Sequence, residues 1–364
     1  MREAPLPPGG TIGILGGGQL GRMLSTAASR LGLKTHIYSD ENDAPAFDVA
    51  AKTTIGAYDD EAAIAGFARV VDIVTCEFEN VPASTLEAAG RAAPVFPPPR
   101  AFAVAQDRLV EKEFISGLGI QIAPFAAVDD IASLKRAISL TKLPAILKTR
   151  RFGYDGKGQV LIREQSEAEA SLQTIGDVPA LLEGMVLFER EISVIVVRGK
   201  DGELRYYDAI ENVHQGGILA TSTVPASIPD DVAYAAREIA GRIANALSYV
   251  GVLCVEMFQC EGSSPNLVVN EMAPRVHNSG HWTLDACLVS QFENHIRAIA
   301  GWPLGETSRH SDAAMTNLIG DDVNSWPELA AAEGTGLHLY GKAEARPGRK
   351  MGHYTRNTRI VPKR

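Results

Sequence analysis

Residues 249–282 read YVGVLCVEMFQCEGSSPNLVVNEMAPRVHNSGHW, and the fold of the chain depends on how this stretch is built. Its first part, 249–258, and a second apolar run, 267–269, are short and rich in β-branched residues, as buried strands are. The residues between them, 261–266, have the composition of a turn. The pattern therefore predicts an antiparallel hairpin of two core strands.

Two carboxylates belong to this predicted hairpin. Glu256 ends a strand that is apolar on both faces, where a lone carboxylate is costly unless it is paired or bound to a metal. The hairpin would place Glu256 opposite Glu271, with the amide oxygen of Asn270 beside them. Oxygen ligands of this kind suit Mg²⁺, which leaves coordination positions for phosphates. We predict a Mg²⁺ site at these three residues, with Mn²⁺ as the alternative ion.

A dense polar segment, residues 270–282, begins at the end of the second strand. A surface loop does not need so many different donors and acceptors, so we predict that this segment carries chemistry. The alternative is a buried hydrogen-bond network that only fixes a loop. A zinc site is not favoured, because Asn278 stands between His277 and His281 where H-E-x-x-H has its glutamate, and Gly280 disfavours the helix.

Composition sets the class of protein. The chain has 364 residues, 45% hydrophobic and 22% charged, which suits a globular protein of two or three domains. The net charge of -9 argues against general nucleic-acid binding. The four cysteines lack C-x-x-C spacing, so we expect a reducing, cytoplasmic location. We expect no membrane-spanning segment, and residues 1–10, with three prolines, are expected to be a disordered leader.

The first hundred residues alternate between strand and helix patterns and predict an open parallel α/β sheet. Strands are expected at 11–15, 35–39 and 70–74, and helices at 20–31 and 60–69. The prolines at 94 and 97–99 indicate the end of this domain.

A glycine loop follows the first predicted strand. Gly16, Gly18 and Gly21 match G-x-G-x-x-G, and Asp40 lies about 20 residues further on, as in dinucleotide-binding folds. An NAD(P)-dependent oxidoreductase is therefore an alternative from another reaction class. Such glycines also serve any loop that approaches a phosphorylated ligand closely.

A second glycine-rich segment, 153–159 (GYDGKGQ), lies between two predicted strands. It is not a Walker A loop, because Gln159 takes the lysine position and a strand follows instead of a helix. With Lys148 and Lys157 close by, it suits a flap whose amides cover a polyphosphate. The alternative is a plain flexible hairpin. Near the C-terminus, Lys342 and residues 346–350 (RPGRK) place cations around a turn, either as a phosphate site or as a solvated face.

Taken together, these motifs resemble those of the ATP-grasp enzymes, and within them they are closely similar to the N5-carboxyaminoimidazole ribonucleotide synthase family. The similarity covers about residues 11–354. Its most specific parts are 18–24 (GQLGRML), 153–159, 270–282, 317–320 (NLIG) and 346–350.

The resemblance implies an α/β (α+β ATP-grasp) architecture. Its expected parts are an N-terminal Rossmann-like substrate domain (1–106), a small ATP-grasp subdomain with the flap (107–190) and a large one with the metal site (191–364). It implies a ligase that joins bicarbonate to 5-aminoimidazole ribonucleotide at the expense of ATP, through carboxyphosphate, in purine biosynthesis. A formate-dependent glycinamide ribonucleotide transformylase is the alternative within the superfamily. A homodimer is expected.

The resemblance also implies roles for individual residues. Expected to bind ATP are Arg108, Lys148, Gly153, Tyr154, Asp155, Gly156, Lys157, Gly158, Gln159, Glu183, Gly184, Met185, Val186, Glu191, His214, Asn270 and Glu271. Expected to bind the ribonucleotide are Gln19, Leu20, Glu77, Tyr154, Asp155, Arg275, His277, Asn278, Lys342, Arg349 and Lys350. Arg275, Tyr154, Asp155 and His277 are expected to act in catalysis, with Arg275 holding the carboxyphosphate anion.

Overall fold

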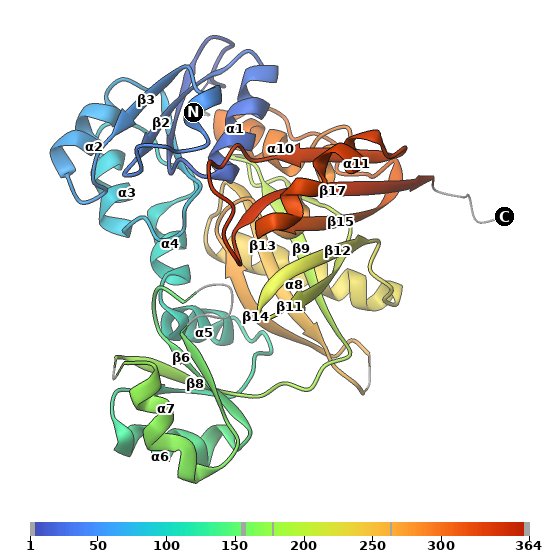
Figure 1. Ribbon diagram of the computed structural model, residues 1–364. Coiled ribbons are helices and arrows are strands. Elements are labelled where there is room, and N and C mark those ends of the chain that lie inside the picture. Colours follow the sequence, from blue (N-terminus) through green and yellow to red (C-terminus); the bar gives the residue numbers. More distant parts are fainter. Residues whose placement is uncertain (1–3, 154–157, 177, 263, 360–364) are drawn as a thin grey trace.

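The structure is a computed structural model that describes residues 4–153, 158–176, 178–262 and 264–359. Within these residues the strands form three sheets that follow one another along the chain (Figure 1). The architecture is mixed α/β, as predicted. None of the helices in the described ranges is both long and apolar enough to cross a bilayer.

The first sheet is parallel throughout, with the order β3-β2-β1-β4. Its strands are β1 (Thr11–Leu15), β2 (Lys34–Ser39), β3 (Lys52–Ile55) and β4 (Ile73–Cys76), and the helices of this part are α1 (Gln19–Arg30), α2 (Glu61–Ala68), α3 (Ala83–Gly90) and α4 (Pro99–Ala105). The predicted open parallel sheet is confirmed. The strand expected at 70–74 starts at Ile73 instead, because the amide of Val70 still bonds back to Phe67 at the end of α2.

The second sheet is antiparallel, with the order β5-β8-β6-β7. Its strands are β5 (Phe125–Val128), β6 (Ala145–Thr149), β7 (Gln159–Ile162) and β8 (Ala180–Gly184), and the helices of this part are α5 (Arg108–Gly117), α6 (Ile131–Thr141) and α7 (Ala168–Thr174). An apolar core that includes Leu134, Leu147 and Leu182 holds α6 and α7 against the sheet. The glycine-rich segment 153–159 thus connects two neighbouring strands, β6 and β7.

The third sheet is antiparallel, with the order β14-β13-β9-β11-β12-β15-β17-β16, and β10 pairs with β9. Its strands are β9 (Arg190–Arg198), β10 (Leu204–Tyr206), β11 (Ile210–Gln215), β12 (Ile218–Val224), β13 (Gly251–Gln259), β14 (Leu267–Ala273), β15 (Ser311–Ile319), β16 (Thr335–Leu339) and β17 (Lys350–Arg359). The helices of this part are α8 (Asp230–Ala246), α9 (Thr283–Ala286), α10 (Gln291–Ala300) and α11 (Trp326–Ala331). Since β14 ends the order, one of its edges faces away from the sheet.

The predicted hairpin is confirmed as β13 and β14, which pair antiparallel with Glu256 directly opposite Glu271. One step further on, Met257 pairs with Val269, so Asn270 has no register partner and forms a bulge. A bulge interrupts the alternation of side chains along a strand and is common beside active sites. Two of the predicted cation ligands, Asn270 and Glu271, therefore lie at the point where the bulge interrupts the regular pairing of β13 and β14.

The expectation of a disordered leader is wrong for residues 4–10. The Leu6 amide donates to the carbonyl of Ala300 at 2.9 Å, and the indole of Trp302 donates to the carbonyl of Leu6 at 2.7 Å. The Leu6 side chain also packs against the main apolar core. The prolines and glycines of residues 4–10 do not predict this contact, because Ala300 and Trp302 lie almost 300 positions further along the sequence.

A buried histidine joins the first and third sheets. His295 on α10 accepts a hydrogen bond at Nδ1 from the amide of Val252 (3.1 Å), and its Nε2 lies 2.9 Å from Thr75 Oγ1 on β4. Because Nδ1 accepts, Nε2 carries the proton and donates to Thr75. Burial lowers the pKa of His295 to about 3.

Acid is therefore expected to destabilise the protein partly through His295. Its pKa is about 3 in the folded state and 6.5 when exposed, so the unfolded state binds a proton first as the pH falls. The contribution of neutral His295 to the free energy of unfolding is therefore complete above pH 6.5, and it is lost progressively as the pH falls towards 3. The free energy of unfolding, measured by urea denaturation at several pH values, should fall less steeply with decreasing pH in His295→Gln than in the wild type. The difference in slope should be up to about 1.4 kcal/mol per pH unit. His310→Gln, at an exposed position, is the control, and equal slopes in wild type and His295→Gln would contradict the prediction.

Candidate active site

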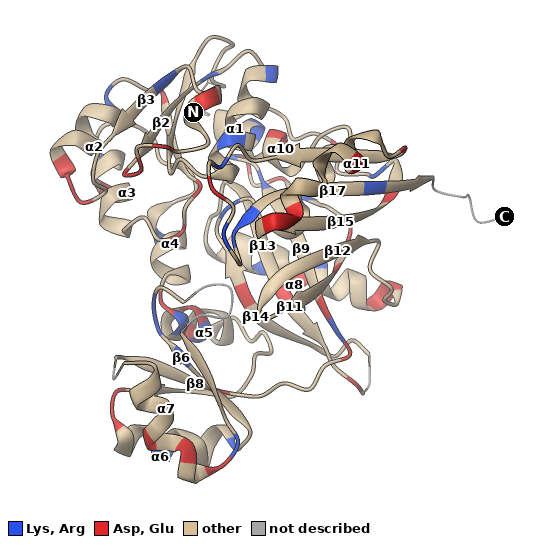
Figure 2. Cartoon of the chain, in the orientation of Figure 1, with Lys and Arg blue, Asp and Glu red and all other residues tan. Residues whose placement is uncertain are grey.

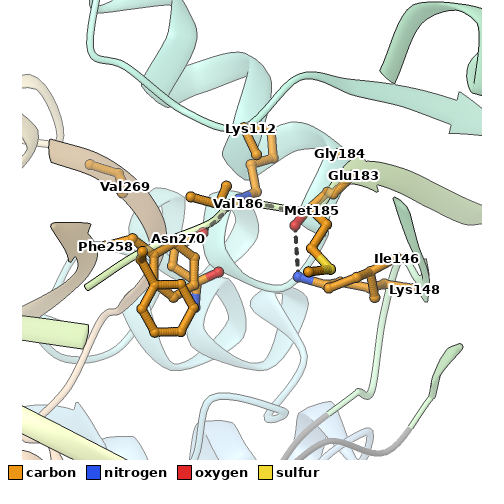
Figure 3. Close-up of a pocket in the computed structure, with 12 residues that line it drawn as sticks. Lys112, Ile146, Lys148, Glu183, Gly184, Met185, Val186, Phe258, Val269 and Asn270 are labelled. Atoms are coloured by element: carbon orange, nitrogen blue, oxygen red, sulfur yellow. Dashed lines mark hydrogen bonds and ion pairs between the residues drawn. The ribbon is translucent and has the colours of Figure 1, made fainter. Parts of the chain in front are cut away.

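A cavity of about 230 Å³ opens between the second and third sheets. Figure 3 shows that residues from α5, β6, β8, β13 and β14 line it. The lining residues are Lys112, Ala123, Ile146, Lys148, Glu183, Gly184, Met185, Val186, Phe188, Phe258, Val269 and Asn270. Phe188 and Phe258 stack with ring centres 4.5 Å apart, so one end is aromatic while lysines and a carboxylate occupy the other. Such a mixed lining suits a flat ring joined to charged groups.

The charged end of the cavity is organised by Glu183. Its Oε2 accepts from Lys148 Nζ at 2.7 Å, and its Oε1 lies 3.2 Å from Lys112 Nζ. Burial opposes ionisation of Glu183, but Lys148 and then Lys112 outweigh it and lower its pKa to about 2. Glu183 therefore remains charged, and it fixes the position of Lys148.

The two carboxylates of the hairpin lie next to the cavity. Arg108 Nη1 donates to Glu271 Oε2 at 3.1 Å, while Glu256 Oε1 lies 3.4 Å from His277 Nε2. Burial, and then the neighbouring Glu271 carboxylate, raise the pKa of Glu256 to about 8. Two carboxylates that repel each other, one of them largely buried, have the character of a cation site.

Glu191 and His214 lie on neighbouring strands, β9 and β11, and form a hydrogen bond through Glu191 Oε2 and His214 Nδ1. Burial lowers the pKa of His214, but the bond to Glu191 outweighs it, and the pKa lies above its usual value. Glu256 and Glu271 also contribute to this rise, so His214 lies within the electrostatic field of the carboxylate pair.

The glycine loop between β1 and α1 binds a carboxylate of its own chain. Gly18 donates its amide to Glu77 Oε1 at 2.6 Å, and Glu77 is 6% exposed. A side chain at Gly16 would begin 2.7 Å from Glu77, which explains the glycine there. Because Glu77 takes the position at which a dinucleotide fold would hold a pyrophosphate, the dinucleotide interpretation is not favoured.

Arg275 follows β14 and faces the first sheet. Its Nη2 and Nε lie 2.8 Å and 3.1 Å from Glu79 Oε2, in the loop after β4. Arg275 and Lys342 both lower the pKa of Glu77 against the larger effect of burial, which raises it. The guanidinium thus lies where the N-terminal part meets the carboxylate hairpin.

His277 and Asn278 are held by neighbouring side chains. His277 Nδ1 lies 2.9 Å from Ser279 Oγ, and burial lowers the pKa of His277 well below its usual value. Asn278 exchanges two amide hydrogen bonds with Asn317 on β15, at 3.0 Å and 2.7 Å. These contacts fix both side chains beside Glu256 and Arg275.

Lys and Arg residues gather in the turn before β17 (Figure 2). At the start of this segment Gly341 approaches Arg22 of α1. Lys342 Nζ donates to the carbonyl of Lys350 at 2.7 Å, and Arg349 Nη1 donates to the carbonyl of Glu344 at 2.9 Å. Burial, and then Arg349, lower the pKa of Lys342 to about 8. A bound anion would relieve this crowding of positive charge.

Tyr154, Asp155, Gly156 and Lys157 lie outside the described residues. The carbonyl of Gly153 accepts from Arg108 Nη2 at 3.2 Å, and Gly158 has a φ of 71°, which favours glycine. Gln19 and Leu20 begin α1, next to the Gly18 amide that binds Glu77.

Asp285, His338 and His353 form a second group with metal-ligand atoms within 4.8 Å of one another. The two imidazoles are stacked, with ring centres 4.5 Å apart and an angle of 12° between their planes. Since the lone pairs of imidazole nitrogens lie in the ring planes, two parallel rings do not direct them at one ion. His338 Nε2 instead lies 3.0 Å from both Asp285 oxygens, and His353 Nδ1 lies 2.8 Å from the Tyr340 hydroxyl.

Comparison with known proteins identifies the family. Family models match the chain over residues 10–106 (ribonucleotide synthetase preATP-grasp domain), 113–292 (ATP-grasp domain) and 313–359 (phosphoribosylaminoimidazole carboxylase C-terminal domain). The N5-carboxyaminoimidazole ribonucleotide synthase of Brucella melitensis is 51% identical over 358 residues, which cover 98% of each chain. The chain belongs to the N5-carboxyaminoimidazole ribonucleotide synthase family.

Solved structures of N5-carboxyaminoimidazole ribonucleotide synthases agree with the fold. That from Thermus thermophilus matches with a TM-score of 0.89 and 45% identity, covering 95% of this chain and 93% of the other. That from Aspergillus clavatus, solved in complex with ADP and 5-aminoimidazole ribonucleotide, matches with a TM-score of 0.90 and 30% identity, covering 97% and 94%. As a member of this family, the chain is an ATP-grasp ligase.

Two residues that organise the site, Glu111 and Lys112, were not among the residues expected from the sequence; both contact the strand that carries Glu271. Asn317, which begins the motif 317–320, pairs with Asn278. The helical spacing of Glu111 and Lys112 from Arg108 was the available signal, since residues three and four apart share a helix face.

Proposed function

We propose that this enzyme carboxylates 5-aminoimidazole ribonucleotide with bicarbonate and ATP, giving the N5-carbamate, ADP and phosphate, in purine biosynthesis. The observation that carries this proposal is the placement of the hairpin carboxylates between two differently built sets of side chains. One set lines the aromatic and lysine-lined cavity, and the other is the charged cluster of Glu77, Arg275 and Lys342. The Aspergillus clavatus enzyme, solved with ADP and 5-aminoimidazole ribonucleotide, supports the assignment.

In this proposal the base of ATP lies in the cavity, near Phe188 and Phe258 and against residues 183–186. The phosphates would point to Lys148, Arg108 and the glycine-rich segment. The cavity is smaller than the ~300–1,000 Å³ typical for drug-sized ligands, so it would take the base rather than the whole nucleotide. Glu191 and His214 would contact the ribose end.

The carboxylate pair fits a divalent cation. Glu256 and Glu271 face each other in register, and burial, followed by repulsion from Glu271, raises the pKa of Glu256. A bound cation would favour the charged form of both carboxylates. Glu256, Glu271 and Asn270 would hold Mg²⁺ or Mn²⁺. The ion supplies neutralisation of the charge on the transferring phosphoryl group.

The chain's own residues would then act on the phosphorylated bicarbonate. Bicarbonate is a poor electrophile, so its phosphorylation to carboxyphosphate supplies a leaving group. Arg275, oriented by Glu79, would hold the carboxyphosphate anion beside His277. Glu77 and Gln19 would orient the ribonucleotide, and Lys342, Arg349 and Lys350 would bind its phosphate. Closure of the 153–159 segment would exclude water from a hydrolysable intermediate.

We also propose the domain limits 1–106, 107–190 and 191–364, a homodimer and a cytoplasmic location. The division follows the three sheets, and the location follows the cysteine usage and the need for ATP. Light scattering on the purified protein would test the dimer, which should have twice the chain mass of 38.9 kDa.

The decisive experiment measures phosphate release from ATP. We expect release to require both bicarbonate and 5-aminoimidazole ribonucleotide for full rate, and formate with glycinamide ribonucleotide not to substitute. As a control on the glycine loop, NAD or NADP should show no saturable binding at micromolar concentrations. Phosphate release that ignores the ribonucleotide, or saturable dinucleotide binding, would contradict the proposal.

A further inference from the structure

We propose that Glu111 and Lys112, two neighbouring residues of α5, are positioning residues that hold the bulge carrying Asn270 and Glu271 and couple it to the nucleotide cavity. This inference rests on the proposed function, because it takes the bulge to be the cation-binding element. Neither residue is among the expected ligands. Lys112 contacts two residues that are, Asn270 and Glu183, whereas Glu111 binds the backbone of Met272, the residue after Glu271.

The need for such residues follows from the position of β14. One edge of β14 pairs with β13, and the other faces away from the sheet, so its backbone groups need other partners. Lys112 Nζ donates to the carbonyl of Asn270 at 2.6 Å, and Glu111 Oε1 accepts from the amide of Met272 at 2.6 Å. With Arg108 on the Glu271 carboxylate, α5 contacts three consecutive residues at the bulge.

These contacts come from one rigid face of a helix. Arg108, Glu111 and Lys112 are three and four residues apart and therefore neighbours on the helix surface. The start of α5 is itself fixed, because Asp107 accepts from the amide of Leu109 at 3.0 Å and binds Arg150 with two hydrogen bonds, at 3.0 Å and 2.8 Å. Because α5 is held in place at its start, its contacts can fix the position of the bulge.

Lys112 also reaches the nucleotide cavity. It is 1% exposed, and its ammonium group lies between the Asn270 carbonyl and Glu183 Oε1, which are 2.6 Å and 3.2 Å away (Figure 3). Glu183 in turn fixes Lys148, on the phosphate side of the cavity. A continuous chain of contacts therefore joins β14 in the third sheet to β8 and β6 in the second. Nucleotide binding in the cavity and the positions of the cation ligands Asn270 and Glu271 should therefore depend on each other.

The first test compares Lys112→Met with Lys135→Met, a control on α6 whose lysine is half-exposed and 3.9 Å from Glu169. Calorimetry would measure ADP binding in EDTA and in Mg²⁺. In the wild type and in Lys135→Met, Mg²⁺ should strengthen ADP binding. In Lys112→Met that strengthening should fall by about 10- to 100-fold, the usual effect of losing a residue that orients a metal ligand.

The second test does not depend on metal or on activity, and it covers the case in which Lys112→Met fails to fold, since Glu183 would lose a buried partner. Amide hydrogen exchange of the ligand-free protein should accelerate in residues 267–273 of Glu111→Ala, while β15 and β17 stay protected. Glu111→Gln should restore protection, because its amide oxygen still accepts from Met272. A merely structural role would accelerate exchange in all three strands.

The outcomes separate the two proposals. If Mg²⁺ strengthens ADP binding equally in the wild type and Lys112→Met, and exchange in 267–273 is unchanged in Glu111→Ala, the positioning role is wrong. If Mg²⁺ has no effect on ADP binding even in the wild type, the cation site itself is wrong, and the coupling with it.

Discussion

Replacing Glu271 by glutamine is expected to lower ligase turnover by roughly 150- to 1,000-fold while the protein still folds. Glu271 faces Glu256 across the hairpin, and a glutamine there removes one of the two negative charges that would hold the cation. Loss of a metal ligand costs several kcal/mol in the transition state of phosphoryl transfer, and about 3–4 kcal/mol corresponds to that change in rate. Steady-state kinetics at saturating Mg²⁺ would measure it.

The control for this variant is Glu261→Gln, the same substitution in the exposed turn at the other end of the hairpin. It should keep normal turnover. Because Glu271 also binds Arg108, the melting temperature of Glu271→Gln needs to be compared with that of the wild type. A folded Glu271→Gln with near-normal turnover would remove the proposed cation site.

Much of the fold follows from sequence because its signals are local. The strand at 11–15, the hairpin of β13 and β14 and the helix starting after Asp107 each have a periodicity or cap of their own. The strand expected at 70–74 starts at Ile73 because Val70, although as apolar as a strand requires, bonds back to Phe67 at the end of α2. Hydrophobicity alone does not distinguish the start of a strand from the end of a helix.

The site was less predictable, because its contacts join distant parts of the chain. The spacing of glycines suggested a phosphate at Gly18, whereas the structure places the carboxylate of Glu77 there, 59 residues away. The pairing of Arg275 with Glu79 spans 196 residues. No periodicity in the sequence encodes such contacts. The sequence therefore indicated which residues have suitable side chains, but it did not indicate which of these side chains form pairs with one another.

Arg349→Ala is expected to raise the KM for the ribonucleotide by roughly 10- to 150-fold, because a charge-assisted hydrogen bond to phosphate contributes about 1.5–3 kcal/mol. Arg349 lies close enough to Lys342 to lower the pKa of that lysine, after the larger effect of burial. The phosphate is remote from the reacting atoms, so the contact would persist from ground state to transition state, and turnover and the KM for ATP should change little.

The matched control for Arg349→Ala is Arg346→Ala, in the same turn. Arg346 is exposed and paired with Glu344 at 2.6 Å and 3.0 Å, so its loss should leave both KM values unchanged. Kinetics that vary each substrate in turn would distinguish the two arginines. A raised KM for ATP with an unchanged KM for the ribonucleotide in Arg349→Ala would place the cationic turn at the nucleotide site. In that case the two substrates would have to exchange places relative to the carboxylate hairpin.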